Sequence, residues 1–231
     1  MIEVKNLSKV FRKESIEVQV LQDVSLSVQK GEFIAIMAPS GMGKSTLLNI
    51  LGCLDKPSSG EYILDGVPVQ DMDDDELSRI RNEKIGFVFQ SFHLLPRMTA
   101  WENVILPLIY GDSDGDLKDR AVKVLTSVGL ADRMDHLPRE LSGGQQQRVA
   151  IARSLINNPR IILADEPTGN LDSASGQEIM KIFRELHSSG TTLVIVTHDM
   201  DVARQTDRIV EMKDGRISND RPTRSPVEAA I

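Results

Sequence analysis

Residues 33–46 of this chain read FIAIMAPSGMGKST, and they join two different kinds of sequence. The first part, Phe33–Met37, is an unbroken apolar run, which is typical of a central parallel strand covered on both faces. The second part is a loop with two glycines that ends in Lys44, Ser45 and Thr46, and a helical pattern follows it. Backbone N–H groups of such a loop can surround a phosphate group. The stretch therefore predicts an α/β protein with a phosphate-binding loop between a buried strand and a helix.

The residues of this loop have separate expected tasks. Lys44 supplies a positive charge near the β- and γ-phosphates of a nucleotide, and the Ser45 hydroxyl can ligate magnesium. Ala38 stands where the first glycine of such loops is usual, and it costs about 1 kcal/mol if the position requires a positive φ. Met42 is bulkier than the usual small residue there. The residues expected to contact the nucleotide are Ser40, Gly41, Met42, Gly43, Lys44, Ser45 and Thr46.

A second anion site is predicted at residues 141–148, which read LSGGQQQR. Ser142, Gly143 and Gly144 open a strongly helical run, and the unpaired N–H groups at a helix N-terminus attract anions. Two phosphate sites in one small chain call for an explanation.

Further apolar runs complete the predicted core. Ile161–Ala164 and Thr192–Val196 are short and unbroken, as central parallel strands are. By contrast, Ile2–Leu7 and Leu21–Val28 alternate apolar and polar residues, which predicts an antiparallel sheet with one solvated face. The fold class is therefore predicted to be α/β with a mixed central sheet and an N-terminal antiparallel β subdomain.

An inserted α-helical subdomain is predicted between the first and second apolar runs. Asp116 is a suitable N-cap, and Gly129 fits the end of the same helix. A later helix is expected to start at Asp172 or Ser173, with Ser175 and Glu178 as a capping box. The predicted division of the chain is a core over 1–91 and 159–218, a helical subdomain over 92–158 and a flexible tail over 219–231.

Two carboxylates follow the predicted strand at 161–164 directly. Asp165 is expected to hold magnesium through water, and Glu166 to polarise an attacking water molecule as general base. General bases of this kind contribute about 10²–10⁴ in rate. Two carboxylates on a loop are by themselves as often without function as functional. The phosphate loop in the same chain favours the functional interpretation.

Composition limits the classes of function. The 231 residues carry 34 acidic and 27 basic side chains, so the surface lacks the general positive field of proteins that bind nucleic acid by charge. The single Cys53 cannot form an internal disulfide. No signal-peptide pattern opens the chain, and no apolar run is long enough to cross a bilayer. A cytoplasmic protein is expected, and any role in transport would come from a separate membrane subunit.

The motifs together resemble those of ABC-transporter ATPases. The resemblance is carried by Leu47–Asp55, Leu141–Arg153 and Leu163–Asp172 in addition to the phosphate loop. Within that family the chain is most similar to the group of macrolide exporters (MacB), lipoprotein-releasing systems (LolD) and the cell-division ATPase FtsE. The resemblance implies a P-loop NTPase core, ATP and Mg²⁺ as ligands, and ATP hydrolysis.

The resemblance also implies roles for residues that carry weak signals alone. Gln90, after the strand-like run Ile85–Phe89, corresponds to a glutamine that touches magnesium and the attacking water. His198 corresponds to a histidine that contacts the γ-phosphate, and Phe11 to an aromatic ring that stacks on adenine. Asp172 would help to align two subunits. The signature loop that completes a neighbouring nucleotide site corresponds to Ser142, Gly143, Gly144 and Gln145.

Partners follow from the same resemblance. It implies a head-to-tail homodimer with two ATP molecules, an integral membrane permease that docks near Ser91–Trp101, and a periplasmic adaptor reached through the permease. The chain would lie on the inner face of the cell membrane and bind no nucleic acid. Two alternatives use the same nucleotide chemistry: a soluble ABC ATPase of DNA repair or translation, and an ATP-driven regulator of cell-wall enzymes. The first usually carries coiled-coil insertions, zinc cysteines or a second ATPase domain, and the second shares every residue named above.

Overall fold

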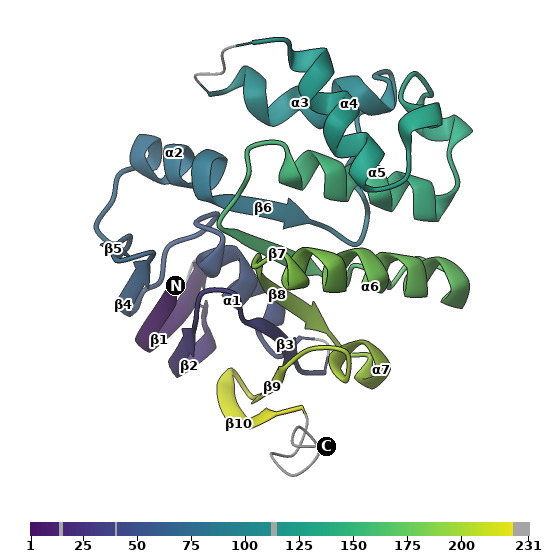
Figure 1. Ribbon diagram of the computed structural model, residues 1–231. Helices are drawn as coiled ribbons and strands as arrows, with labels where there is room; N and C mark the ends of the chain where they lie inside the picture. The colour runs from purple at the N-terminus through teal and green to yellow at the C-terminus, as the bar shows by residue number, and fades with distance from the viewer. Residues whose placement is uncertain (14–15, 40, 112–114, 224–231) are drawn as a thin grey trace. The chain divides into compact units, whose positions relative to one another are not determined.

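The computed structural model describes residues 1–13, 16–39, 41–111 and 115–223. The chain divides into two compact units. The first unit combines residues 1–78 with the chain from Thr192 onward, and the second holds residues 79–191 (Figure 1). Within the described residues, no helix combines the length and the apolar character needed to cross a membrane.

The first unit contains the antiparallel sheet that the alternating sequence predicts. Strand β1 (Ile2–Lys13) pairs with β2 (Ile16–Val28) on one side and with β4 (Ser59–Leu64) on the other, and β5 (Val67–Pro68) follows β4. The apolar members of the second half of β2 are buried between exposed or half-exposed neighbours. The prediction of a one-faced antiparallel sheet is therefore confirmed.

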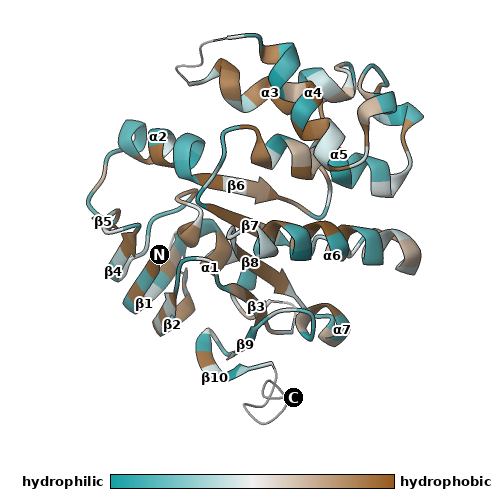
Figure 2. Cartoon of the chain, viewed as in Figure 1, coloured by the Kyte–Doolittle hydropathy of each residue, from teal (hydrophilic) through white to brown (hydrophobic). Residues whose placement is uncertain are grey.

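The other strands of this unit form a mixed sheet. Strand β3 (Phe33–Met37) pairs in parallel with both β8 (Thr192–Thr197) and β9 (Arg208–Lys213). Every residue of β3 and β8 is buried, and Figure 2 draws β8 largely in the colour of hydrophobic residues. These unbroken apolar runs are thus central strands, as their composition predicts.

The predicted tail is wrong at its start. Residues 219–222 belong to β10 (Arg216–Pro222), which pairs antiparallel with β9. The Arg208 guanidinium donates to both carboxylate oxygens of Asp220 at 2.6 Å and also binds Glu32 at 2.9 Å. These ion pairs raise the pKa of Arg208. They hold a polar segment in the sheet, and residues 224–231 lie outside the described part of the chain.

The first unit includes the helix α1 (Lys44–Leu51) and the short helix α7 (Met200–Ala203). A third helix, α2 (Asp74–Lys84), crosses the boundary between the units. Asp73 accepts the N–H of Glu76 at 2.9 Å, and the Glu76 carboxylate accepts the N–H of Asp73 at 3.0 Å. The acidic run at this point is a solvated helix start and needs no ligand.

The second unit combines a parallel strand pair with a group of helices (Figure 1). Strand β6 pairs in parallel with β7, and α5 packs against β6, α3, α4 and α6. The elements are β6 (Ile85–Val88), α3 (Ala100–Ile109), α4 (Leu117–Ser127), the single turns Ala131–Arg133 and Pro138–Glu140, α5 (Gly143–Leu155), β7 (Ile161–Asp165) and α6 (Ser173–Ser188). The helical segment predicted at 92–158 lies inside this unit, which also includes β6, β7 and α6. The compact unit, residues 79–191, is therefore larger than the predicted helical subdomain.

Helix ends in this unit are fixed by side-chain caps. Asp116 accepts the N–H groups of Lys118 and Asp119 at 2.8 and 3.2 Å, as predicted for the start of α4. Asp172 caps α6, but the predicted box at Ser175 and Glu178 is wrong. Ser175 lies within the first turn, and its hydroxyl donates to Asp172 at 2.7 Å. Asp172 is the N-cap because its carboxylate accepts two backbone N–H groups of the first turn.

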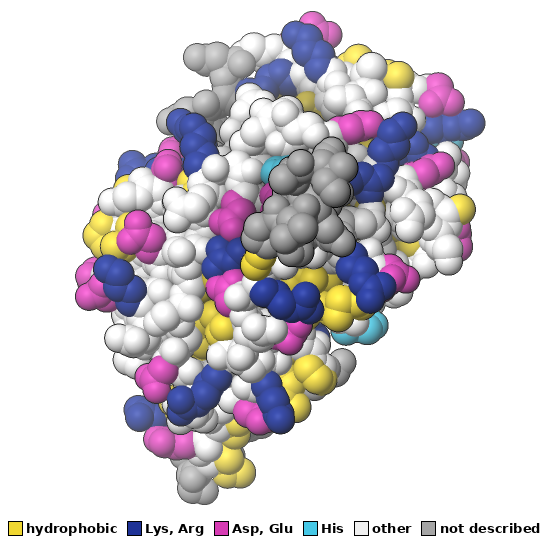
Figure 3. All heavy atoms as spheres, turned by 60° about the horizontal axis from the view of Figure 1, so that its bottom comes forward, with side chains coloured by type: hydrophobic (Ala, Val, Ile, Leu, Met, Phe, Trp, Pro, Cys, Tyr) yellow, Lys and Arg dark blue, Asp and Glu magenta, His cyan; other side chains and the backbone are white. Residues whose placement is uncertain are grey.

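Charges are mixed on the surface that Figure 3 draws. Lysine and arginine side chains lie among aspartate and glutamate side chains there. Mixed charges of this kind give the face no single sign.

Asn103 of α3 is the polar anchor of the segment that precedes this helix. Its side chain is fully buried, and its amide oxygen accepts the N–H of Leu95 at 2.7 Å. Its amide nitrogen donates to the carbonyl oxygens of Leu95, Met98 and Thr99 at 3.2, 2.9 and 3.0 Å. One side chain therefore holds the turn over residues 95–99.

We expect Asn103→Ala to lower the free energy of unfolding by about 1–3 kcal/mol, because buried backbone groups lose their partners. Urea denaturation followed by circular dichroism measures the change. Ser127→Ala is the control, since the Ser127 hydroxyl only donates to Val124 at an exposed helix end; it should change stability by less than about 0.5 kcal/mol. Equal stability of Asn103→Ala and the wild type would contradict the assignment.

Candidate functional site

The phosphate loop of the first unit lies between β3 and α1, as predicted. Gly43 has φ 89° and forms the N-cap of α1. A Cβ atom at Gly43 would come within 2.8 Å of the Leu21 side chain and 2.9 Å of the Val20 carbonyl oxygen. Only glycine fits there, for both conformation and space. Gly41 also has a positive φ, 80°, while the predicted contact residue Ser40 lies outside the described residues.

The alanine in place of the first glycine is compatible with this loop. Among the described residues with positive φ, the loop contributes Gly41 and Gly43 but not Ala38. Ala38 is buried with 6% of its surface exposed. An L-residue at negative φ carries no left-handed strain. The departure from the usual motif therefore costs the loop no backbone strain.

Lys44 lies over the loop that precedes it. Its ammonium donates to the carbonyl oxygen of Ala38 and, at 3.2 Å, to that of Pro39. Only 8% of the residue is exposed. Ser45 and Thr46 stand in the first turn of α1, exposed and half-exposed respectively, with Met42 half-exposed before them. The loop thus combines a fixed cation with a helix N-terminus, which together favour an anion.

His198 is brought to the same edge of the sheet as the phosphate loop. Met37 of β3 pairs in parallel with Thr197 of β8, so the chain leaves both strands at one end. His198 follows at once and is exposed. Parallel register therefore places a histidine and a phosphate loop side by side, as the sequence interpretation requires.

Phe11 is a half-exposed ring on the antiparallel sheet of the same unit. It lies in β1 opposite Val18 of β2, and 45% of its surface is exposed. The Lys9 ammonium lies 5.0 Å from the centre of the ring. The neighbouring residues Val20 and Leu21 of β2 approach Gly43, so β2 connects the ring to the phosphate loop. An exposed aromatic ring on this strand pair can stack on a base.

In the second unit, parallel register brings Gln90 and Glu166 together. Val88 of β6 pairs with Ala164 of β7, and each functional residue follows two positions later. Glu166 has φ 45°, an uncommon conformation for a residue with a side chain. Backbone strain of this kind costs about 1–3 kcal/mol and concentrates at functional sites. Asp165, the last residue of β7, is half-buried.

Gln90 packs directly on the loop that carries Glu166. Its amide nitrogen donates to the side-chain oxygen of Asn170 at 3.3 Å, and the Asn170 amide donates back to the Gln90 carbonyl oxygen at 3.0 Å. A Cβ atom at Gly169 would lie 2.7 Å from the Gln90 amide nitrogen. The glycine therefore permits this close approach.

The signature loop begins α5 through a capping box. The Ser142 hydroxyl oxygen accepts the N–H of Gln145 at 3.3 Å, and the Gln145 side chain accepts the N–H of Ser142 at 2.8 Å. A Cβ atom at Gly144 would lie 3.0 Å from the Ser175 hydroxyl at the start of α6. The helix N-terminus predicted to bind an anion is thus in place, and it lies beside the turn that Asp172 caps.

Asp172 is held in its charged form. Hydrogen bonds from the backbone and the hydroxyl of Ser175 lower the pKa of its carboxyl group, and the N–H of Ala174 adds to this effect. Its task as helix cap is therefore clear from the geometry. Asp172 is also exposed.

Two polar side chains of α5 were missed by the sequence interpretation. Arg153 donates to the carbonyl oxygens of Phe92 and His93 at 2.8 and 2.6 Å, and both of these residues have positive φ. Burial lowers the pKa of its guanidinium group. Gln147 is fully buried and binds the carbonyl oxygens of Phe89 and Pro167. Together they tie α5 to the segments around Gln90 and Glu166.

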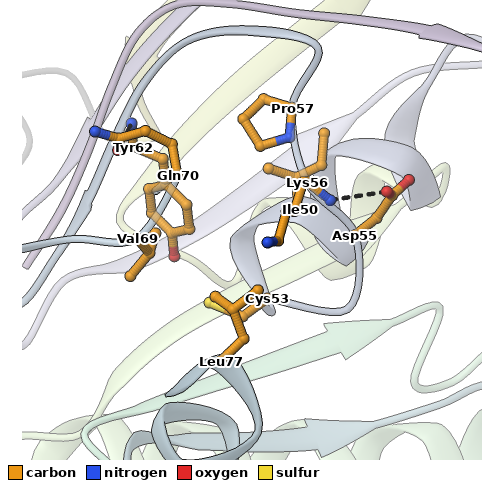
Figure 4. A pocket seen from close by; sticks show the side chains of 9 residues that line it. All are labelled: Ile50, Cys53, Asp55, Lys56, Pro57, Tyr62, Val69, Gln70 and Leu77. Carbon is orange, nitrogen blue, oxygen red and sulfur yellow. Dashed lines mark hydrogen bonds between the residues drawn. The ribbon is translucent and has the colours of Figure 1, made fainter. Parts of the chain in front are cut away.

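A small pocket of the first unit is made of packing residues (Figure 4). Ile50, Cys53, Tyr62 and Leu77 are among its lining side chains, and none of the residues labelled there is a predicted site residue. The Tyr62 hydroxyl donates to the Leu51 carbonyl oxygen at 2.5 Å, and burial raises the pKa of Tyr62 well above its usual value. The pocket belongs to the structure around the end of α1.

The side chains expected to hold magnesium carry the kind of donor atom that this ion prefers. Ser45, Gln90 and Asp165 offer a hydroxyl, an amide and a carboxylate oxygen, and Mg²⁺ prefers hard oxygen ligands together with substrate phosphates and water.

Comparisons with known proteins agree with this assembly of motifs. Residues 21–169 match the family described as ABC transporter. The chain is 54% identical over 220 residues to a macrolide export ATP-binding/permease protein MacB of Bdellovibrio bacteriovorus, covering 95% of this chain and 34% of that protein. It is 53% identical to the uncharacterized ABC transporter ATP-binding protein YvrO of Bacillus subtilis, covering 94% of this chain and 95% of YvrO. The chain thus spans about a third of the MacB relatives but nearly all of YvrO.

Solved structures agree as well. The chain is similar to the ATP-binding cassette MJ0796 in a dimeric post-hydrolysis state bound to ADP and Pi, with a TM-score of 0.90 and 48% identity over 97% of this chain and 100% of that one. A second dimeric structure of MJ0796, described as a bacterial ABC transporter cassette, gives a TM-score of 0.89 and 50% identity.

Proposed function

Because this chain belongs to the ABC transporter family and is an ATPase of the ABC type, we propose that it binds ATP with Mg²⁺ between two copies of itself and drives a membrane permease by hydrolysis. One observation carries the proposal: Glu166, in a strained conformation at the end of β7, lies beside Gln90 at the end of the paired strand β6. A general base next to a water-orienting amide is what hydrolysis of a phosphoanhydride requires.

Nucleotide binding is assigned to groups with matching chemistry. The Lys44 ammonium and the N–H groups at the start of α1 bind the phosphates, and Phe11 stacks on the adenine base. Gly41, Gly43, Met42 and Thr46 complete the loop. Ser45, Gln90 and Asp165 hold Mg²⁺, which neutralises phosphate charge when it is bound.

The proposed reaction needs one proton acceptor and one water molecule. Glu166 takes a proton from water as the water oxygen attacks the γ-phosphorus atom. The bond from that phosphorus to the bridging oxygen breaks, and ADP and phosphate are formed. Gln90 orients the water, and His198 contacts the γ-phosphate.

The signature loop supports a site shared between two copies. Ser142, Gly143, Gly144 and Gln145 present a helix N-terminus that is suited to the γ-phosphate bound by a second chain. Asp172 would align the two copies. The related cassette MJ0796 is described as a dimer bound to ADP and Pi, which supports this arrangement. Loss of the γ-phosphate would then release the two copies from each other.

A permease partner is proposed from the relatives. MacB proteins are named as ATP-binding/permease proteins, so a permease joined to this chain or separate from it fits the family. The segment Ser91–Trp101, in which Leu95 is 46% exposed, is the proposed contact region. Export of a small molecule, extraction of a lipoprotein and mechanical signalling across the membrane are the tasks open to such a system, with a periplasmic adaptor reached through the permease. The chain would lie at the inner face of the cell membrane.

Purification from membranes tests this proposal. Tagged Glu166→Gln protein, which is expected to keep ATP bound, is isolated from detergent-solubilised membranes with and without ATP, and its partners are identified by mass spectrometry. Lys44→Ala protein is the control without bound ATP. Recovery of a multi-helix permease supports the proposal, whereas recovery of soluble repair or translation proteins, or of nucleic acid, overturns it.

We expect Phe11→Ala to weaken ATP binding about 5- to 150-fold, because stacking of a base on an aromatic ring contributes about 1–3 kcal/mol. Isothermal titration calorimetry measures the change. Phe11→Tyr keeps a ring and should bind ATP as the wild type does, and inorganic triphosphate should bind equally to all three proteins. Equal loss of triphosphate binding would contradict a role in contacting the base.

A further inference from the structure

Gln147 is a buried amide with an unusual set of partners. None of its surface is exposed, and it stands on α5, the helix that Ser142 begins. Its amide nitrogen donates to the Pro167 carbonyl oxygen at 2.7 Å and to the Phe89 carbonyl oxygen at 3.4 Å. Both partners are backbone groups, so the hydrogen bonds fix the course of the main chain.

The two carbonyl groups flank the proposed catalytic residues. Phe89 directly precedes Gln90, and Pro167 directly follows Glu166. One amide thus connects the loop that orients water to the loop that carries the general base. Through α5 it connects both of them to the signature loop. In the second unit, Gln147 joins three segments that the proposed function assigns to the nucleotide.

Stability alone does not account for this amide. The Gln147 side-chain oxygen is buried without a hydrogen-bond partner among the described residues. A buried acceptor without a partner costs about 1–3 kcal/mol. A methionine or leucine of similar volume would fill the same space without that cost. The cost suggests that the donating half of the amide is kept for its effect on the two loops.

We propose that Gln147 is a positioning residue for ATP hydrolysis, whose amide sets Gln90 and Glu166 in their reacting arrangement and ties that arrangement to the signature loop. This inference rests on the proposed function. Gln147 touches no reacting atom and acts through the main chain at Phe89 and Pro167. Displacement of a reacting group by about 1 Å can lower a rate about 100-fold, so two hydrogen bonds at this point can matter for catalysis.

Steady-state kinetics of Gln147→Met test the inference in the full chain. Methionine keeps the length of the side chain but donates no hydrogen bond. We expect kcat to fall about 10- to 100-fold, while KM for ATP stays within about 3-fold, because the phosphate loop belongs to the other unit. The melting temperature is measured in parallel, and kinetics are recorded well below it.

Ser154→Ala is the matched control. Ser154 is also a buried polar residue of α5, but its hydroxyl donates to the Ile151 carbonyl oxygen within the helix. Its kcat should stay within about 2-fold of the wild type. A purely structural role for Gln147 predicts that Gln147→Met lowers only the melting temperature, as Ser154→Ala would, and that result overturns the inference.

Gln147→Glu keeps the inference testable should the methionine variant fail to fold. The glutamate has the same shape and can donate to Pro167 only when it is protonated, and burial raises the pKa of a carboxyl group. We expect its kcat relative to wild type to rise as the pH is lowered from about 10 to about 6, because buried glutamate carboxyl groups reach pKa values of about 8–9. A constant ratio over this range overturns the inference.

The same measurements distinguish failure of the positioning role from failure of the proposed function. Wild type and Glu166→Gln are measured beside the Gln147 variants. Loss of activity in Glu166→Gln with full kcat in Gln147→Met overturns the positioning role alone. An inactive wild type, or an active Glu166→Gln protein, overturns the proposed function instead.

Discussion

Replacing Glu166 by glutamine will lower the rate of ATP hydrolysis about 10²- to 10⁴-fold and leave ATP binding nearly unchanged. The amide has the shape of the carboxylate but cannot accept the proton of the attacking water. The strained backbone at this position, with φ 45°, aims one particular side chain and does not depend on its charge. Phosphate release measures the rate, and calorimetry measures the affinity for ATP.

Glu185→Gln is the control for this change. Glu185 lies on α6 of the same unit, where its carboxylate is 3.9 Å from the Lys181 ammonium and 60% exposed. The same loss of charge at this surface position should leave kcat within about 2-fold of the wild type. A Glu166→Gln protein that keeps more than about a third of the wild-type rate would show that another group accepts the proton.

Lys44→Ala will weaken ATP binding about 30- to 1,000-fold, which corresponds to about 2–4 kcal/mol. The ammonium is held over the loop by the carbonyl oxygens of Ala38 and Pro39, and it is mostly buried. A cation fixed in this way loses little freedom when phosphates arrive, so its removal costs most of its electrostatic contribution. Calorimetric titration with Mg·ATP measures the loss.

Lys30→Ala provides the comparison at an exposed position of the same unit. It removes the same charge away from the phosphate loop and should change the affinity by less than about 2-fold. If the two alanine variants bound ATP equally well, Lys44 would have no part in the nucleotide site. Circular dichroism of both proteins checks that the fold is kept.

The positions of several strands could be predicted because the pattern of apolar residues shows which segments are buried. Unbroken apolar runs predicted the strands β3, β7 and β8, and segments with alternating apolar and polar residues predicted β1 and β2. Since parallel strands end at one edge, the positions of His198 and of Gln90 with Glu166 followed from where each strand stops. The apolar pattern therefore predicted where the candidate site residues lie as well as which residues form the core.

Polar partners were much harder to predict. The strand β10 consists mostly of polar residues and is held by Arg208 and Asp220, a pair separated by a turn. The start of α6 at Asp172 was predicted, but the capping box expected at Ser175 and Glu178 was wrong, because local hydrogen bonds compete within one turn. Side-chain periodicity reports which residues are buried, but it does not report which polar groups bind one another.

The sequence position of Gln147 indicates that its side chain is buried. It stands three residues after Gly144 and three before Ala150, both of them buried, so it occupies the buried stripe of α5. A polar residue in such a stripe needs hydrogen-bond partners. The sequence could not identify them, because Phe89 and Pro167 lie 58 and 20 residues away along the chain.

The central claim, a nucleotide held between two copies of this chain, is tested most directly by the mass of Glu166→Gln protein in solution. Size-exclusion chromatography with light scattering is run in ATP, in ADP and with the additional change Ser142→Arg. We expect a dimer of the 25.6 kDa chain in ATP, a monomer in ADP, and a monomer for the Ser142→Arg variant although it still binds ATP. A Glu166→Gln protein that stays monomeric in saturating ATP, or a Ser142→Arg variant that dimerises equally well, would contradict the account.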